Sequence, residues 1–145
     1  METITLRRNI IQRLFGICAT KQPADDGCWT IQGKNTVVDL DRVPELAEPN
    51  RAVRLEKKGV PDRLLLIHGG DGRYHAFKNR CTHGGRRLDS VPGTPQVQCC
   101  SIGRSTYDYS GKVLSGPAKG PLRVLPVHIE NGSLVIEGEG ARFEA

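Results

Sequence analysis

Single glycine and proline residues interrupt the chain every few positions, and short runs of apolar and β-branched residues lie between them. The chain has 17 Gly and 9 Pro among 145 residues, where average usage of about 12% would give roughly 17 in total. Such punctuation is typical of an all-β domain. We expect strands at residues 36–40, 52–55, 63–68, 74–78, 97–100, 113–114, 122–130 and 133–137.

Two dipeptides of the kind found in tight hairpin turns separate neighbouring runs. Asp71-Gly72 and Asn131-Gly132 each lie between two β-prone segments at hairpin spacing. Hairpins of this type join antiparallel strands, so the predicted fold is an antiparallel β domain.

The N-terminal part of the chain has a different periodicity. Apolar side chains recur at helical spacing between residues 5 and 15, and Gly16 follows as a candidate C-cap. We predict a short amphipathic helix there, which either docks on a membrane or a partner or packs across the end of a β-sandwich. Residues 24–34 look like a polar connection. We therefore divide the chain into a helical extension, residues 1–35, and a β domain, residues 36–145.

Composition limits the classes of partner. The excess of 21 Lys+Arg over 16 Asp+Glu is scattered along the chain, so we expect no nucleic-acid surface. No run approaches the roughly 18 apolar residues of a membrane span, and we expect no such span.

Five cysteines are an odd number in a chain long enough to bury its own core, which argues against a secreted disulfide scaffold and favours the cytoplasm.

Two glycine-rich stretches, residues 81–95 and 101–118, are too long to be simple turns, and long loops on a rigid scaffold usually carry function. The first begins Cys81-Thr82-His83-Gly84-Gly85-Arg86-Arg87-Leu88. The second follows Cys99-Cys100 and reads Ser101-Ile102-Gly103-Arg104-Ser105-Thr106-Tyr107-Asp108, with Ser115-Gly116-Pro117-Ala118 beyond it. Cys81 lies two residues from His83 in a glycine-rich turn, as metal ligands often do.

With these motifs, residues 36–138 resemble the Rieske family of 2Fe-2S proteins. That family places a Cys-x-His loop about 16 residues before a Cys-x-x-His-Gly loop and covers the cluster with a Gly-Pro-Ala segment. Here 16 residues separate His83 from Cys100. The resemblance implies an antiparallel β-sandwich with a small cluster-binding subdomain, and a 2Fe-2S cluster with Cys81 and Cys100 on one iron and His83 on the other.

The resemblance implies further roles around the cluster. Ser105 and Tyr107 match positions where relatives place hydroxyls that hydrogen-bond to cluster sulfur, and Pro117 lies in the covering segment. Respiratory relatives tie the two loops with a disulfide, but the corresponding positions here are Arg86 and Ile102. The chain therefore resembles the soluble ferredoxin-type branch.

One position departs from the family pattern. Gly103 stands where the second histidine ligand belongs, and the next residue, Arg104, has no lone pair to offer a metal. In a first interpretation the cluster still forms, and its fourth protein ligand is replaced by Cys99, by solvent or a small anion, or by a distant histidine: His68, His75 or His128. Because Cys99 and Cys100 are adjacent, they point to opposite faces if both lie on a strand.

Two other interpretations stay open. The cluster is lost and the fold serves as a protein interaction or regulatory module, or Cys81, His83, Cys99 and Cys100 hold a mononuclear metal such as zinc.

We favour a small Rieske-type protein that carries one electron to or from a protein partner. No motif for a substrate pocket or a nucleotide is present, so we expect a component of an oxidoreductase system with no reaction of its own. Arg86, Arg87 and Arg104 would favour an acidic partner.

Residues outside the motifs receive structural interpretations. Cys18 and Cys28 are expected to be bystanders, and Trp29 is expected to anchor the N-terminal extension. His68 is expected to be solvated at a strand end, and His75 and His128 to be ordinary strand residues.

Overall fold

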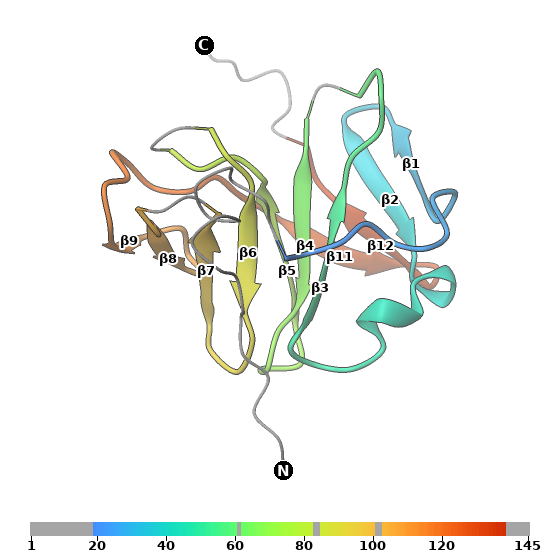
Figure 1. Ribbon diagram of the computed structural model, residues 1–145. Helices are drawn as coiled ribbons and strands as arrows, with labels where there is room; N and C mark the ends of the chain where they lie inside the picture. The colour runs from blue at the N-terminus through green and yellow to red at the C-terminus, as the bar shows by residue number, and fades with distance from the viewer. Residues whose placement is uncertain (1–18, 61, 83–84, 101–102, 139–145) are drawn as a thin grey trace.

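The computed structural model describes residues 19–60, 62–82, 85–100 and 103–138 (Figure 1). These residues form twelve strands in three antiparallel sheets of four strands each, with two short 3-10 helices, η1 (Leu40–Arg42) and η2 (Pro44–Leu46). The all-β antiparallel prediction is confirmed. Among the described residues, no helix is long and apolar enough to cross a membrane.

The strands of the first sheet come from both ends of the chain. It has the order β1-β2-β12-β11 and consists of β1 (Trp29–Gln32), β2 (Asn35–Asp39), β11 (Val127–Glu130) and β12 (Ser133–Ile136). The second sheet has the order β10-β5-β4-β3, with β3 (Arg51–Leu55), β4 (Leu64–His68), β5 (Tyr74–Lys78) and β10 (Val124–Leu125). The third has the order β6-β7-β8-β9, with β6 (Leu88–Val91), β7 (Gln96–Cys99), β8 (Thr106–Asp108) and β9 (Val113–Ser115).

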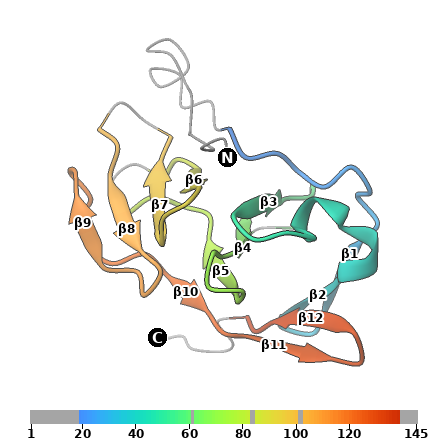
Figure 2. The same cartoon turned by 90° about the horizontal axis from the view of Figure 1, so that it is seen from below.

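The second sheet lies between the other two (Figure 2). Alternate side chains of β4 enter two separate cores: Leu64 and Leu66 belong to one, and Leu65 and Ile67 to the other. Residues on successive positions of a strand point to opposite faces, so β4 is buried on both sides. The third sheet therefore packs on the outer face of the second, as the predicted cluster-binding subdomain would.

Both predicted hairpins are confirmed. Asn131 and Gly132 join β11 to β12 with φ values of 53° and 81°, and two successive positive φ values are the signature of the type I′ turn that suits twisted strands. Asp71-Gly72 joins β4 to β5, and Gly72 has a φ of 81°.

Three strands lie where no strand was expected. β1 falls within the predicted polar connection, and β6 and β8 fall within the two predicted long loops. In β1, an edge strand, only Trp29 is buried, while the other three side chains are exposed. Burial of Trp29 in the first core agrees with its predicted anchoring role. The helix predicted at residues 5–15 lies outside the described residues, so the division at residue 35 stays a prediction.

His68 differs from its expected state. It is half-buried rather than solvated, because its Nδ1 lies 2.8 Å from the carbonyl oxygen of Leu46 and its ring stacks on Tyr74 with centroids 4.7 Å apart.

Candidate functional site

The two cysteine-containing loops meet at one end of the third sheet. The first connects β5 to β6, and the second connects β7 to β8. The Cys100 amide donates to the carbonyl of Arg87 at 3.0 Å, which joins the second loop to the first. The Cys99 amide donates to the carbonyl of Ser105 at 2.8 Å and so closes the base of the second loop.

Polar side chains hold the first loop in shape. Fully buried Asn79 accepts a hydrogen bond from the Leu88 amide at 2.7 Å, across the base of the loop. Arg63 donates to the Gly85 carbonyl at 2.7 Å and to the Asn79 carbonyl at 3.2 Å. Within the loop, the Cys81 amide donates to the Arg86 carbonyl at 2.8 Å. The Cys81 carbonyl accepts the Gly85 amide at 2.8 Å, so both backbone polar groups of Cys81 are hydrogen-bonded within the loop.

The Cys81 thiol faces the hydroxyl of Tyr107. The two atoms lie 3.3 Å apart in a buried setting, and the same oxygen lies 3.1 Å from the Thr82 amide and 3.0 Å from the Thr82 hydroxyl. Burial and the neighbouring Cys81 thiol raise the pKa of Tyr107 to about 12. The phenol therefore keeps its proton at neutral pH and can donate it to sulfur.

Ser105 is fully buried, and its Oγ has no hydrogen-bond partner within the described part of the chain. Buried hydroxyls are nearly always paired, so this one fits a site that receives a group able to accept a hydrogen bond. Gly116, in the predicted covering segment, packs directly on it: a Cβ there would lie 2.5 Å from the Ser105 Cα. Pro117 follows and is exposed.

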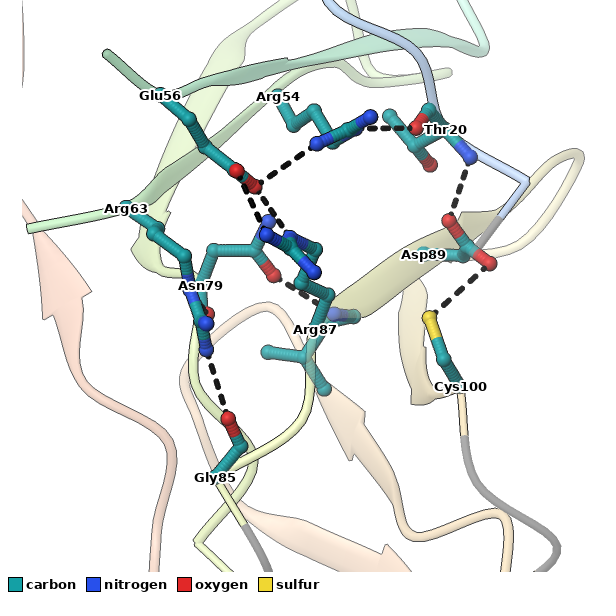
Figure 3. Close-up of polar contacts among 10 residues, drawn as sticks. Thr20, Arg54, Glu56, Arg63, Asn79, Gly85, Arg87, Asp89 and Cys100 are labelled. Carbon is teal, nitrogen blue, oxygen red and sulfur yellow. Dashed lines mark hydrogen bonds and ion pairs between the residues drawn. The ribbon is translucent and has the colours of Figure 1, made fainter. Parts of the chain in front are cut away.

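Cys100 points to a different set of groups. Its Sγ lies 3.5 Å from Oδ2 of Asp89, a fully buried residue of β6, and can donate to it. The same carboxylate accepts the Thr20 amide at 2.7 Å (Figure 3) and the Ala19 amide at 2.8 Å. Arg54, from β3, donates to the Thr20 carbonyl at 3.0 Å. The segment that begins at residue 19 is therefore tied both to the second sheet and to the Cys100 loop.

A partly buried carboxylate links the loops to the second sheet. Glu56 receives a two-pronged ion pair from Arg87 at 2.5 and 2.9 Å and a second pair from Arg54 at 3.1 Å (Figure 3). Burial raises the pKa of Glu56, but the hydrogen bonds from Arg87 and Arg54 outweigh it, so the pKa lies below the ordinary glutamate value. Arg87, one of the three arginines expected to favour an acidic partner, is thus paired with a carboxylate of its own chain.

The structure describes Cys81, Cys100 and Gly103 of the predicted ligand pattern, and the ligand set itself stays a prediction. Cys81 and Cys100 are both buried, one on each loop, while Gly103 and Arg104 are exposed. His83 lies outside the described residues. Among the residues that are described, no three His, Cys, Asp or Glu side chains converge as a metal site.

Cys99 and Cys100 have different surroundings. Cys99 ends β7 and is buried in the second core, whereas Cys100 follows the strand and faces Asp89. The prediction that the two side chains point to opposite faces required both to lie on a strand, and Cys100 lies beyond the end of β7.

The three distant histidines are engaged elsewhere. His75 lies six residues before Cys81 in β5, roughly 20 Å along an extended chain, and contacts Asp71 at 3.0 Å and the Tyr109 ring. His68, whose contacts are described above, lies at the same hairpin end of β4. His128 pairs with Glu137 at 3.3 Å in the first sheet. His75 and His128 are ordinary strand residues, as expected, and none of the three is placed to complete a centre at the loops.

The donor set fits an iron-sulfur group. Two buried thiols on hydrogen-bonded loops, a phenol against one sulfur and an unpaired buried hydroxyl are the features that such a cluster uses. Cys28, by contrast, is buried in the first core, where burial raises the pKa of its thiol, and it has a structural place only.

Several residues of the site could not be found by inspection of the sequence. Asn79, Arg63, Glu56 and Asp89 hold the loops, yet each acts on partners between 9 and 70 residues away. No local sequence pattern marks these four residues, because they reach the loops only when the chain folds.

Comparisons with known proteins point to one family. A family model described as Rieske [2Fe-2S] domain matches residues 36–126. The 3-phenylpropionate/cinnamic acid dioxygenase ferredoxin subunit of Escherichia coli is 32% identical over 97 residues, which cover 66% of this chain and 84% of that protein.

Solved structures agree at the level of the fold. The ferredoxin of carbazole 1,9a-dioxygenase from Nocardioides aromaticivorans gives a TM-score of 0.56 at 21% identity and covers 71% of this chain and 95% of that one. A complex of reduced oxygenase and oxidized ferredoxin in carbazole 1,9a-dioxygenase gives a TM-score of 0.54 at 24% identity, and the match covers 63% of this chain and 84% of that one.

Proposed function

Because the chain belongs to the Rieske 2Fe-2S domain family, we propose that it is a small electron-transfer protein that passes one electron at a time to or from an oxidoreductase partner. The observation that carries this proposal is the pair of buried thiols, Cys81 and Cys100, on two loops that hydrogen-bond to each other. A 2Fe-2S cluster bound there supplies one-electron chemistry.

Cys81 and Cys100 are the proposed ligands of one iron, and His83 is the proposed ligand of the other. The Cys81 side of this assignment is supported by the Tyr107 hydroxyl at 3.3 Å from sulfur. The unpaired buried hydroxyl of Ser105 supports a second hydrogen bond toward the cluster. Pro117, next to the glycine that packs on Ser105, would cover this side of the site.

The fourth ligand is proposed to come from outside the protein. Gly103, at the family's histidine position, is exposed in a turn and followed by Arg104, which has a φ of 53° and is also exposed. Solvent or a small anion can reach this position, and the Arg104 guanidinium would stabilise an anion there. The three distant histidines contact other partners, which supports this choice over a histidine ligand.

An oxygenase component is the proposed partner class. The related Escherichia coli protein is a ferredoxin subunit of a dioxygenase, and it matches this chain over 84% of its own length. Arg86 and Arg104 are exposed on the two loops, so we infer an acidic docking surface on the partner and electron transfer that slows as salt concentration rises. A cytoplasmic location is also proposed, since five cysteines are an odd number and argue against a secreted disulfide scaffold.

Metal analysis of anaerobically purified protein tests the proposal. We expect iron and acid-labile sulfide in equal amounts, with thiolate-to-iron absorption bands. Cys81→Ser and Cys100→Ser should abolish both, whereas Cys28→Ser and Cys99→Ser should retain them. Folded protein without iron would instead support a cluster-free interaction module, and zinc without sulfide would support a mononuclear site.

A further inference from the structure

A buried carboxylate lies against one of the two proposed cysteine ligands. Asp89 is fully buried, and its Oδ2 lies 3.5 Å from the Cys100 Sγ. Its two oxygens also accept the amides of Ala19 and Thr20, at 2.8 and 2.7 Å. The carboxylate therefore links the ligand loop to a segment about 70 residues earlier in the chain.

The contacts around Asp89 close into a ring. Arg54 joins the Thr20 carbonyl to Glu56, and Glu56 binds the Arg87 side chain. The Arg87 carbonyl in turn accepts the Cys100 amide at 3.0 Å. The Cys100 amide is thus hydrogen-bonded to Arg87 and the Cys100 thiol to Asp89. Figure 3 shows the contacts of this ring that involve side chains.

The charge of Asp89 acts differently once Cys100 binds metal. A metal-bound cysteine is a thiolate and has no proton to donate, so the carboxylate then faces a sulfur that already shares negative charge. Adding an electron at such a site is disfavoured by a nearby anion. The Ala19 and Thr20 amides oppose this effect, because N–H donors offset part of the carboxylate charge.

We propose that Asp89, together with the amides of Ala19 and Thr20, sets the reduction potential of the site. Asp89 lowers the potential, and the two amides moderate that effect. The inference rests on the proposed function, because it requires Cys100 to ligate the cluster.

Two substitutions with opposite expected signs test the proposal. Asp89→Asn removes the charge, keeps an oxygen for one amide and adds an N–H that can donate to sulfur, so the midpoint potential should rise. Thr20→Pro removes the amide donor at 2.7 Å from Asp89 and leaves the charge, so the potential should fall. Asp71→Asn is the matched control, because that carboxylate also accepts an amide, from Arg73 at 2.9 Å, at the distant hairpin; its potential should equal that of the wild type.

The readouts separate this inference from a purely structural role. Potentials are measured by voltammetry on holoprotein with matched iron content, and electron paramagnetic resonance reports the environment of the cluster. A loop that is merely loosened would move both variants in the same direction, which would overturn the proposal, as would an Asp89→Asn potential equal to that of the wild type. If Asp89→Asn does not bind the cluster, the Thr20→Pro variant tests the proposal alone: a midpoint potential below that of the wild type supports it, and a potential equal to or above it overturns it. Absence of a cluster from the wild type would instead refute the proposed function.

Discussion

At the scale of single residues, the Tyr107 hydroxyl is shared between sulfur and Thr82. The Thr82 hydroxyl donates to the Gly120 carbonyl at 2.7 Å, so its own proton is already used. The single Tyr107 proton can therefore go to Thr82 or to Cys81, which lie 3.0 and 3.3 Å away. A thiolate at Cys81 attracts it more strongly, because hydrogen bonds to charged acceptors are the stronger ones.

Tyr107→Phe should therefore lower the midpoint potential, since a hydrogen bond to sulfur stabilises the added electron. It should also reduce the free energy of unfolding by about 1 kcal/mol, the usual worth of a lost hydrogen bond. Voltammetry and chemical denaturation measure the two effects. Tyr109→Phe is the control, because the Tyr109 hydroxyl donates to the Thr94 carbonyl at 3.3 Å. The midpoint potential of that variant should equal that of the wild type. Equal potentials for Tyr107→Phe and the wild type would contradict the assigned contact.

Gly103→His should restore the family's ligand pattern. A second imidazole on the same iron would move the absorption and paramagnetic resonance spectra toward those of ordinary Rieske centres and strengthen the dependence of the potential on pH. Since Gly103 is exposed in a turn, the larger side chain has room. Spectra that match those of the unsubstituted protein would show that residue 103 does not lie at the iron.

The proposed ligands and the residues that support them differ in whether the sequence alone reveals them. Cys81, His83 and Cys100 are found by local spacing, because a loop that binds a cluster must present its ligands within a few residues. Asp89 and Glu56 are not, since their partners are reached only after the sheets have packed. An Asp inside a short β-prone segment is ordinarily read as a surface residue, whereas here three donors satisfy it in the interior.

At the scale of elements, alternating apolar patterns located the strands that pack on a core from one or both sides. β6 and β8 escaped this criterion because they bury polar side chains: Asp89, Ser90 and Thr106 are 0%, 6% and 8% exposed. Asp89 accepts two amides of the N-terminal segment, and the Thr106 hydroxyl donates to the Arg104 carbonyl at 2.9 Å, so burial of these two side chains costs little. A strand that buries polar side chains cannot be recognised from hydropathy alone.

The covering segment after β9 depends on a glycine for two separate reasons. Gly116 has a φ of 90°, and a Cβ there would lie 2.5 Å from the Ser105 Cα and 2.9 Å from the Ser105 N. Gly116→Ala should therefore cost about 2 to 4 kcal/mol of unfolding free energy, from left-handed backbone strain and from overpacking together. Chemical denaturation of the apoprotein measures it.

Gly93→Ala isolates the backbone contribution to that cost. Gly93 also has a positive φ, of 83°, but nothing lies within 4 Å of the position of its Cβ. Its substitution should cost only about 1 to 2 kcal/mol, the strain of the left-handed conformation. Equal losses for the two variants would show that the covering segment does not press on Ser105.

At the scale of the whole molecule, the second and third sheets are joined by charge as well as by apolar packing. Glu56 follows β3 of the second sheet, and Arg87 precedes β6 of the third, so their ion pair spans the contact between the two sheets. The Glu56 side chain is 14% exposed, whereas those of Arg87 and Arg54 are 37% and 25% exposed. The carboxylate therefore lies on the protected side of the pair, where solvent screens it less than a surface ion pair.

Stability should depend on pH through Glu56. Its pKa in the folded state is lower than the ordinary value, which is about 4.3 in an unfolded chain. A carboxyl group with a depressed folded pKa contributes stability above its unfolded pKa, and that contribution disappears as the pH falls through the folded pKa. Glu56→Gln removes this contribution and leaves two guanidinium groups without their anion, so the variant should lose about 1 to 3 kcal/mol of unfolding free energy at pH 7.

Denaturant titrations of apoprotein measure this pH dependence. The unfolding free energies of the wild type and Glu56→Gln should converge below about pH 4. Asp62→Asn, which removes the exposed partner of Lys78, is the control, and its unfolding free energy should differ little from that of the wild type at pH 7. A gap between the wild type and Glu56→Gln that stays constant down to pH 3 would mean that the ion pair is not what joins the two sheets.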